Sequence, residues 1–494
     1  MSIDISPETI RSVTTYVTDR VRRWVHESES ESSSFEADLL AGMLRDEKGL
    51  GFTVGFVDRV VRPEDPSAAA VHLRTLAEDP PSFLPPGLGS TVKVGALASR
   101  ISPGPVVSTA QAAMRRMVSH LILDARSGPL TRAIEAYQRN GVRLNVNLLG
   151  EAVLGEREAD RRLAGIRELI ERDDVDYCSI KVSAIVDHIS LWGSRDTLDV
   201  IVERLLPLYR LAALQENPTF INLDMEEFHD LELTMNVFEA LLGRKELRDL
   251  YAGVVLQAYL PDAMRTYQRV QEFATQRVAD GGTPVKIRLV KGANLALETV
   301  DASVHGWPLA TFNSKEETDA HYKRVVREAL TPESLEAVHV GVAGHNMFDI
   351  AYAVELMEAR GIPFATDDSP MPLVEFEMLA GMAPAQQKVI AREVGPIRLY
   401  LPIVKPQEFD VAVSYLVRRL EENGSNENFM SALMDLATRE DLFDREAQRF
   451  AASLHRSLTT DAPASHRVGD RTRDERGGIA LGGLSIPAVP GGFC

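Results

Sequence analysis

Polar side chains end most of the short apolar runs in the middle of this sequence, where parallel strands would present them together. Lysine, aspartate and asparagine are depleted in strands, so their recurrence at these positions suggests a site. If the runs form a parallel barrel, chemistry is expected at the C-terminal ends of the strands. The candidate residues are Glu151, Lys181, Asp224, Gln257, Arg288, Lys291, His345, Asn346 and Tyr400.

A further candidate is the helix-like segment YLVRRLEENG, residues 415–424, which places two arginines beside apolar positions. Tyr415, Arg418, Arg419 and Glu422 recur at i, i+3, i+4 and i+7, so they share one face of a helix. Two guanidinium forks on that face could grip one planar carboxylate. The face could instead lie in solvent, where such pairs contribute roughly a few tenths of a kcal/mol. Spacing alone slightly favours the solvated interpretation.

Each candidate also has a purely structural explanation. Lys181 could be a rim lysine whose stem lies along apolar surface, and His345 a hydrogen-bonded rim histidine. The acids of DMEEFHDLE, residues 224–232, could bind a metal with His229, but no HExxH or paired-histidine spacing supports this. Capping of the next helix is favoured instead. Gly292 follows a run directly, where backbone can approach a cofactor closely, although one glycine is a weak signal.

The elements that would position these residues alternate along the chain. Short β-branched runs are separated by amphipathic stretches, which indicates a parallel sheet with crossover helices. Eight such units over about 300 residues predict a (βα)8 TIM barrel, with a doubly wound open sheet as the alternative. The runs span residues 144–150, 177–183, 219–225, 253–260, 284–290, 337–344, 374–379 and 397–403.

The flanks of the chain differ from this middle part. Residues 1–135 are expected to form an N-terminal helical arm and helical region, with a Pro/Gly connector at 78–90 and an amphipathic helix over 109–125. The barrel is placed at 136–440. Residues 441–494, which end in GGIALGGLSIPAVPGGFC, are expected to form a partly disordered tail.

Composition bounds the class of protein. Of 494 residues, 45% are hydrophobic and 26% are charged, which is typical of a globular protein. The net charge of −18 argues against nucleic-acid binding, which uses a basic surface. Cys178 and Cys494 make no disulfide framework, the first residues lack a signal-peptide pattern, and no apolar run approaches a membrane span. We therefore expect a cytoplasmic protein.

An ordered set of seven segments resembles the proline dehydrogenase family, especially the proline dehydrogenase part of the bifunctional proline utilisation proteins. The resemblance covers residues 144–430, and the N-terminal portion is more loosely similar to the arm and helical region of those proteins. The set is far more specific than any one motif. The segments are SIKVSAI, NLDMEEFHDLELTM, VVLQAYLPDA, IRLVKGAN, VAGHN, EFEMLAGMA and YLVRRLEENGSNENF.

The resemblance implies a distorted (βα)8 barrel that holds FAD at the C-terminal ends of its strands and oxidises L-proline to 1-pyrroline-5-carboxylate. Asp224 and Arg288 are implied as the catalytic residues nearest the reacting centre. The resemblance implies that Arg418, Arg419 and Lys181 bind the proline carboxylate. It also implies that Glu151 pairs with Arg418, and that Tyr400 and Leu379 pack on the proline ring.

The resemblance also implies further partners and a flavin-binding set. Electrons would pass to a quinone, with transient membrane contact, as the first step of proline catabolism to glutamate. The sequence leaves open a homo-oligomer, flavin oxidation of another cyclic secondary amine such as hydroxyproline, and a catalytically inactive barrel. The implied flavin-binding residues are Met225, Val255, Gln257, Val290, Lys291, Gly292, Ala293, Gly344, His345, Asn346, Glu422 and Phe429.

Some positions depart from the family pattern. Asn294 and Leu295 stand where many members have Tyr-Trp, Asn147 where an acid is common, and Gly344 where a threonine is common. The first difference concerns how the flavin ring and substrate are packed rather than the hydride chemistry. The bifunctional proteins continue into an aldehyde dehydrogenase, which needs a reactive cysteine in a folded domain. Because Cys494 ends a Gly/Pro-rich segment, no aldehyde dehydrogenase domain is expected in this sequence.

Overall fold

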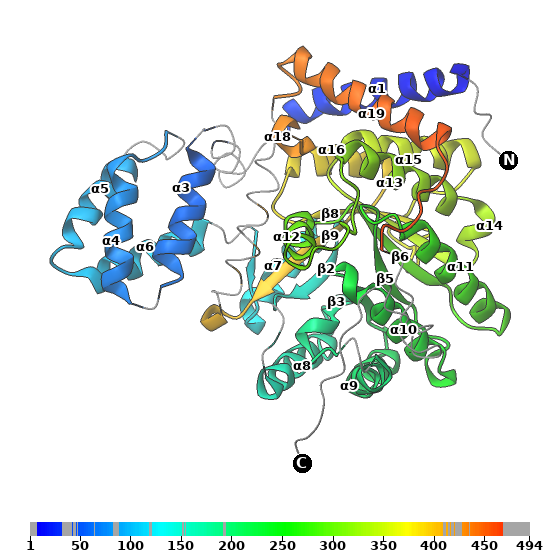
Figure 1. Cartoon of the computed structure of the whole chain (residues 1–494), viewed down its shortest axis with the longest axis horizontal. Coiled ribbons are helices and arrows are strands. Elements are labelled where there is room, and N and C mark those ends of the chain that lie inside the picture. The colour runs from blue at the N-terminus through cyan, green and yellow to red at the C-terminus, as the bar shows by residue number, and fades with distance from the viewer. Residues whose placement is uncertain are drawn as a thin grey trace, which may run out of the picture.

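A closed barrel of eight parallel strands forms the middle of the chain (Figure 1). The strands are β2 (Arg143–Leu148), β3 (Tyr177–Lys181), β4 (Phe220–Asp224), β5 (Ala252–Gln257), β6 (Val285–Val290), β7 (Val338–Ala343), β8 (Val374–Leu379) and β9 (Arg398–Val404). Each pairs in parallel with the next, and the pairing of β9 with both β8 and β2 closes the ring. Each predicted run overlaps one strand, so the barrel is confirmed over the open sheet.

The computed structural model describes most of the chain. The described residues are 7–31, 42, 46, 48–63, 65–82, 88–117, 121–150, 153, 155–190, 194–408, 412, 415, 419, 427–433 and 435–467. Part of the predicted connector at 78–90 and most of the segment 415–424 therefore lie outside the described residues.

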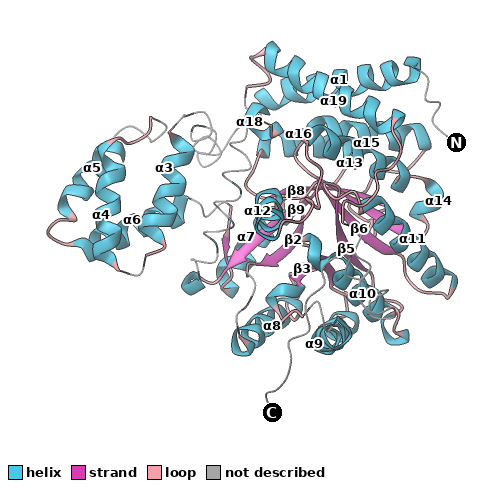
Figure 2. Cartoon of the chain, viewed as in Figure 1, coloured by secondary structure: helices cyan, strands magenta, loops and turns pink. Residues whose placement is uncertain are grey.

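Helices surround the barrel and complete its βα units (Figure 2). The principal ones are α7 (Ser127–Gln138), α8 (Glu156–Ile170), α9 (Ser194–Leu214), α10 (Leu231–Leu242), α11 (Ala263–Ala279), α13 (Lys315–Ala329), α15 (Met347–Arg360) and α16 (Pro384–Val394). Shorter elements are α12 (Leu295–His305), α14 (Pro332–Leu335) and the 3-10 turns η2 (Val182–Ala184), η3 (Phe228–Asp230), η4 (Lys245–Leu247) and η5 (Pro406–Glu408).

The N-terminal region is helical, as predicted, up to residue 117. Its elements are α1 (Pro7–Glu29), α3 (Gly49–Phe56), the π-helical turn η1 (Val57–Val61), α4 (Pro66–Glu78), α5 (Leu88–Ala98) and α6 (Pro103–Met117). Figure 1 shows α3 to α6 to one side of the barrel. The predicted helix over 109–125 is wrong in its last part, because β1 (Leu123–Asp124) adds to the edge of β9. Pairing with a distant strand there overrides a local helical pattern.

Helix α1 lies against the barrel rather than against the other N-terminal helices. Val17, Val21 and Trp24 recur at helical spacing and are buried against α15 and α16. The indole N–H of Trp24 donates to Glu393 Oε2 over 2.7 Å, which satisfies the polar edge of a fully buried ring. The arm is therefore part of the barrel's packing.

The described residues of the C-terminal part include the helices α18 (Phe429–Leu433) and α19 (Glu440–Thr459). The prediction of a tail from residue 441 is therefore wrong for residues 441–459, which form α19. Phe443, Phe450 and Leu454 of α19 are buried, and the Phe450 ring lies 5.7 Å from that of Phe348 on α15. A helix with this buried face belongs to the core, whereas the Gly/Pro-rich composition that suggested a tail begins only at residue 477.

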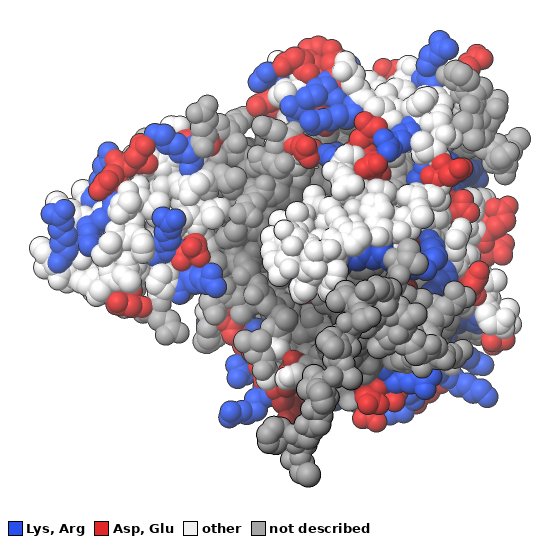
Figure 3. Space-filling view, in the orientation of Figure 1, with Lys and Arg blue, Asp and Glu red and all other residues white. Residues whose placement is uncertain are grey.

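The surface of the molecule carries both signs of charge. In Figure 3 acidic and basic side chains are interspersed over the outer helices, and one uncharged area lies over α12. Within the described residues, no helix combines the length and apolar character needed to cross a lipid bilayer.

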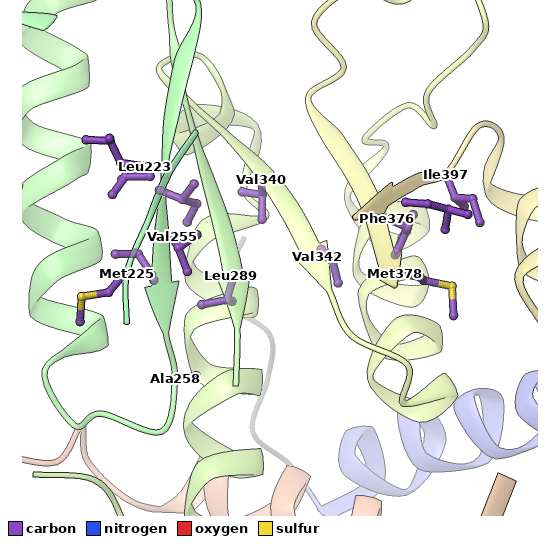
Figure 4. Close-up of a cluster of buried hydrophobic side chains, with 14 of the residues drawn as sticks. Leu223, Met225, Val255, Ala258, Leu289, Val340, Val342, Phe376, Met378 and Ile397 are labelled. Atoms are coloured by element: carbon purple, nitrogen blue, oxygen red, sulfur yellow. The ribbon is translucent and has the colours of Figure 1, made fainter. Parts of the chain in front are cut away.

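Apolar side chains of the strands pack outward against the helices. Leu289, Val340, Val342, Phe376 and Met378 come from three neighbouring strands and belong to one large buried cluster (Figure 4). They occupy alternate positions along each strand, because successive side chains point to opposite faces of a sheet. The other positions of the same strands are polar and supply the site.

Candidate functional site

The strands bring the predicted residues to one end of the barrel. Lys181 lies opposite Asp224 at the end of the β3–β4 pair, and Leu379 lies opposite Tyr400 in the β8–β9 pair. His345 follows β7 by two residues. All of these strands are parallel, so their C-terminal ends form a single rim, as expected for the functional face of such a barrel.

A tyrosine and an aspartate meet on this rim. The Tyr400 hydroxyl donates to Asp224 Oδ2 over 2.9 Å and accepts from Asn147 Nδ2 over 2.5 Å. Asn222 Nδ2 donates to Asp224 Oδ1 over 2.8 Å, and the Arg288 guanidinium lies 5.0 Å from the centre of the Tyr400 ring. Burial raises the pKa of Asp224, and the charge of Arg288 opposes that rise. The two predicted catalytic residues are thus neighbours across Tyr400.

Lys181 is paired with an acid that the sequence analysis assigned to another role. Its Nζ lies 2.6 Å from Glu226 Oε1, and Glu226 Oε2 accepts from the Ser183 hydroxyl over 2.6 Å. A carboxylate that approached Lys181 would share this ammonium group with Glu226. The expected placement of acids at the start of the next helix is seen in part: Glu232 lies in the first turn of α10, whereas the N-cap residue Asp230 makes no side-chain hydrogen bond.

The inside of the barrel holds a group of charges, here called the interior ion network, made of Lys286, Arg288, Glu375, Glu377 and Arg398. Arg288 Nε lies 2.7 Å from Glu377 Oε2, and Lys286 Nζ lies 2.7 Å from Glu377 Oε1 and 2.5 Å from Glu375 Oε2. Arg398 Nε lies 2.8 Å from the same oxygen of Glu375. The network is a layer of charged side chains beneath Asp224 and Tyr400. Within it, Glu377 fixes the Arg288 guanidinium through its Nε.

Two features make this network compatible with a folded barrel. Burial alone would raise the pKa of Glu375, but Arg398 and Lys286 hold it well below its usual value. Gly341 on β7 supplies the space, because a Cβ at this position would collide with Glu377 Oε1. The sequence PVKIRLV alternates apolar and polar residues as a half-exposed strand would, yet its polar face lines the interior.

Lys291, directly after β6, lies in a second group of charges. Its Nζ is 2.5 Å from Asp319 Oδ1 on α13 and 2.5 Å from Asp349 Oδ2 on α15. Lys315 also pairs with Asp319, and Lys323 Nζ lies 2.7 Å from Asp349 Oδ1. Burial alone would lower the pKa of Lys291, but Asp319 and Asp349 raise it above its usual value. This lysine is therefore a fixed cation at the rim.

His345 is held as a neutral ring. Its Nε2 accepts the backbone N–H of Leu379 over 3.0 Å, which assigns the ring proton to Nδ1. Burial, together with the nearby charge of Arg419, lowers the pKa of His345 to about 3. Nδ1 is buried and has no hydrogen-bond partner within the part of the chain that the structure describes. It is a donor available to a ligand.

A matching acceptor lies two strands away on the rim. Gln257 Nε2 donates to the carbonyl groups of Met225 and Glu226, over 3.1 and 3.2 Å. Its buried Oε1 makes no hydrogen bond of good geometry among the described residues, although the Tyr259 hydroxyl interacts with this side chain. Gly292 has φ of 121°, and a Cβ there would overlap the Tyr259 ring. Close packing on Tyr259 thus gives a reason for this glycine that does not require a cofactor.

The remaining predicted residues lie in different environments. Val255 is buried in β5, and Phe429 packs edge-on against Phe348 with ring centres 6.2 Å apart. Asn346 caps α15, since its Oδ1 accepts the Phe348 N–H over 3.0 Å. Val290 ends β6 half-buried, whereas Ala293 and Gly344 are exposed on the rim. Glu151, Arg418 and Glu422 lie outside the described residues.

Several functional neighbours were not singled out from the sequence. Glu226, Glu377, Asp319 and Asp349 each hold one of the predicted cations, but their partners are distant in sequence. Only Glu226 carried a local signal, as an acid two residues after Asp224. Among the described residues, no group of three or more His, Cys, Asp or Glu side chains could hold a metal ion.

Comparison with known proteins relates this geometry to a family. Residues 130–432 match the family model described as proline dehydrogenase. Proline dehydrogenase 1 of Bacillus subtilis (strain 168) is 25% identical over 306 residues, which are 60% of this chain and 84% of that protein. The bifunctional protein PutA of Escherichia coli (strain K12) is 26% identical over 345 residues, or 65% of this chain and 24% of that protein.

Solved structures show the same relation. The structure of proline utilization A from Corynebacterium freiburgense is 44% identical in sequence, with a TM-score of 0.64 over 72% of this chain and 34% of that one. The protein from Bdellovibrio bacteriovorus, inactivated by N-propargylglycine, is 25% identical, with a TM-score of 0.72 over 88% of this chain and 44% of that one. This chain thus spans less than half the length of either proline utilization A protein.

Proposed function

Because this chain belongs to the proline dehydrogenase family of proline catabolism, we propose that it uses FAD to oxidise L-proline to 1-pyrroline-5-carboxylate. The observation that carries the proposal is the cluster of Asp224, Tyr400 and Arg288 on the barrel rim, within the segment that matches the family. The cluster supports a small polar substrate because it presents a carboxyl group, a hydroxyl group and a cation in one place.

The residues around the cluster fit a flavin cofactor. His345 Nδ1 is a buried donor and Gln257 Oε1 a buried acceptor, so the rim offers both kinds of hydrogen bond to a planar ring with polar edges. Lys291 adds a fixed cation, and Gly344 and Ala293 expose backbone beside it. Of the implied cofactor residues, Val255 and Phe429 would support the site from the core. When bound, FAD would supply the hydride acceptor.

Proline would be held by its carboxylate and by its ring. We assign the carboxylate to Arg419, Arg418 and Lys181, with Glu151 pairing with Arg418. Because Lys181 already pairs with Glu226, it would contribute a shared charge, and the arginines would carry most of the binding. Tyr400 and Leu379, opposite each other at the ends of β8 and β9, would pack on the ring and limit its size.

The electrostatics of the rim favour the deprotonation that must precede hydride loss. The secondary amine has to lose its proton, because the nitrogen lone pair forms the new C=N bond as the hydride leaves. Arg419, Lys181 and Arg288 would depress the pKa of the bound amine. Tyr400 would keep the Asp224 carboxyl fixed beside the nitrogen through its hydrogen bond. Positioning the reacting carbon would then supply most of the rate enhancement.

We further propose that the electrons pass to a quinone during brief contact of this protein with a membrane, and that it is otherwise cytoplasmic. The net charge is −18, and acidic and basic side chains are interspersed on the face seen in Figure 3, so attraction to anionic lipid would not drive this contact. We also propose that the chain assembles into a homo-oligomer. A measurement of its molecular mass in solution tests this part of the proposal.

The test is a visible spectrum of the purified protein before and after L-proline is added without oxygen. Flavin absorption that bleaches with L-proline, but not with D-proline, is the expected result. Bleaching by hydroxyproline alone would change the substrate to another cyclic secondary amine. Flavin that never bleaches would remove proline as the substrate, and absence of flavin after reconstitution with FAD would indicate an inactive barrel.

A variant separates substrate binding from cofactor binding. Arg419→Met should raise the KM for proline by about tenfold or more, since one charge-assisted hydrogen bond contributes roughly 1.5–3 kcal/mol. The flavin absorption per protein should stay near that of the wild type. Loss of the flavin together with proline binding would place Arg419 in the cofactor site instead.

A further inference from the structure

Helix α12 turns most of its large apolar side chains toward solvent and Glu298 toward the protein. Thirteen large apolar side chains are exposed in the described part of the chain, and five of them lie between residues 295 and 307. They are Leu295, Leu297, Val300, Val304 and Trp307, here called the α12 face, and Val304 is 75% exposed. Glu298, on the opposite side, is 3% exposed. This arrangement is the reverse of an ordinary surface helix.

The inward acid has a structural role. Glu298 Oε1 accepts the backbone N–H of Phe228 over 2.6 Å, which ties α12 to the loop after β4. The helix therefore cannot rotate to bury its apolar side without losing this contact. Figure 3 shows the area over α12 as a continuous surface without charged side chains. The five exposed apolar side chains of the α12 face belong to this uncharged area. Exposed apolar side chains that gather in one place mark a contact site, whereas single ones need no explanation.

The end of the described chain is fastened beside this face. Arg467 Nε donates to the carbonyl of Pro308 over 2.7 Å, its Nη1 lies 3.7 Å from Asp301 Oδ2, and its guanidinium lies 5.2 Å from the centre of the Trp307 ring. His466 Nδ1 lies 3.1 Å from the carbonyl oxygen of Leu309. The described part of the chain therefore ends at Arg467, beside the C-terminal end of α12.

The chain beyond this point has the composition that the face requires. Residues 477–494 contain no charged side chain, and Ile479, Leu481, Leu484 and Ile486 form two pairs at a spacing of two residues. Such pairs lie on one side of an extended segment. The nine residues 468–476 can span about 30 Å when extended, and α12 is about 16 Å long. Every part of the α12 face is within reach.

We propose that residues 477–494 of the same chain pack on the α12 face. The segment would lie along the rim of the candidate site, because α12 begins four residues after Lys291. Burial of Leu297, Val300 and Val304 under Ile479 or Leu484 would supply the driving force, without any need for paired charges. The inference does not depend on FAD or proline.

A disulfide trap tests the contact in the full chain. Ser303 is exposed on α12, and Cys178 is buried, so in the Ser303→Cys variant Cys494 would be the natural thiol able to react. Mild oxidation should link position 303 to Cys494 within one monomer, as shown by a non-reducing gel and peptide mapping. Leu214→Cys, at an 84% exposed position on α9, is the control and should give little of this product.

A charge on the face should break the contact without disturbing the fold. Adding Val304→Asp to Ser303→Cys should lower the linked fraction by about tenfold, because a carboxylate is poorly accommodated against apolar side chains. The position is exposed, so an unchanged melting temperature would confirm folding. Equal linking at positions 303 and 214, or a yield that Val304→Asp leaves unchanged, would overturn the proposal.

Other occupants of the face give different results. A disulfide-linked dimer whose yield rises with protein concentration would identify a second copy of the chain and overturn the proposal. Flotation of the wild type, but not of Val304→Asp, with phosphatidylcholine vesicles would identify a lipid surface as the occupant of the face. This result would also overturn the proposal. Flotation of neither protein, together with linking inside the monomer, would support the intramolecular contact.

Discussion

Replacing Glu375 by glutamine should destabilise the barrel from its interior. Glu375 is 1% exposed and lies near three cations, with Lys286 Nζ at 2.5 Å, Arg398 Nε at 2.8 Å and Arg143 Nη1 at 3.4 Å. Glutamine keeps the shape but removes the charge, and it points amide hydrogens at groups that can only donate. Removing one partner of a buried ion pair costs about 3–5 kcal/mol. We therefore expect Glu375→Gln to lower the free energy of unfolding by an amount in this range.

The loss should depend on pH in a specific way. The folded-state pKa of Glu375 is held below its unfolded value, so its contribution to stability is fully present above the unfolded pKa and is lost as pH falls. The difference in unfolding free energy between wild type and Glu375→Gln should therefore be constant above about pH 5 and shrink below it. A merely steric effect of the amide would show no such trend.

The assay is urea unfolding followed by circular dichroism and fluorescence at several pH values. Glu440→Gln is the matched control, because Glu440 makes a comparable 2.8 Å contact with Arg22 on the surface and should have far less effect. If Glu375→Gln and Glu440→Gln shift the unfolding midpoint equally, the interior ion network does not stabilise the barrel and the argument is refuted.

The remaining predictions concern the rim, the strands and the response to acid. Tyr400→Phe should raise the KM for proline by about tenfold in steady-state assays, because Asp224 loses a hydrogen bond; an unchanged KM would remove Tyr400 from the site. Gly341→Ala should lower the unfolding free energy by about 1–3 kcal/mol in urea, since the added Cβ meets Glu377; a neutral effect would show that β7 adjusts. Stability measured by urea should fall as pH drops from about 6.5 to 4, because buried histidines are held neutral and the unfolded chain binds more protons; a flat profile would contradict this assignment. Burial lowers the pKa of His321 to about 3, His339 to about 4 and His345 to about 3.

The barrel was predictable because its signal is local. Each run of β-branched residues occupies one strand, and the alternation with amphipathic helices determines that the sheet is parallel. The two-residue strand β1 carries no such signal, since Leu123 and Asp124 become a strand only by pairing with Ile403 and Val404. Helix α19 did carry a local signal, because Phe443, Phe450 and Leu454 recur at helical spacing. The tail prediction rested on the Gly/Pro-rich segment beyond this helix and wrongly included it.

The site was predictable in its members but not in its pairings. The resemblance identified Lys181 and Arg288, whereas their partners Glu226 and Glu377 are 45 and 89 residues away. Alternation in β6 shows that one face is polar, but the same pattern describes a strand facing water. Only the closed ring makes that face an interior, where each charge needs a partner.

Helix α1 also has a consequence for synthesis of the chain. It packs on α15, α16 and α19. The last of these partners, α19, begins at Glu440, which is 411 residues after α1 ends at Glu29. At about 5–20 residues per second, a nascent α1 would wait roughly 20–80 s for that surface. Until α15 and α16 have been synthesised, the side chains that include Trp24 have no native partner, and they offer a binding site for any chaperone that recognises exposed apolar helices. Helix α1 would thus leave the ribosome well before its partners and complete its docking late.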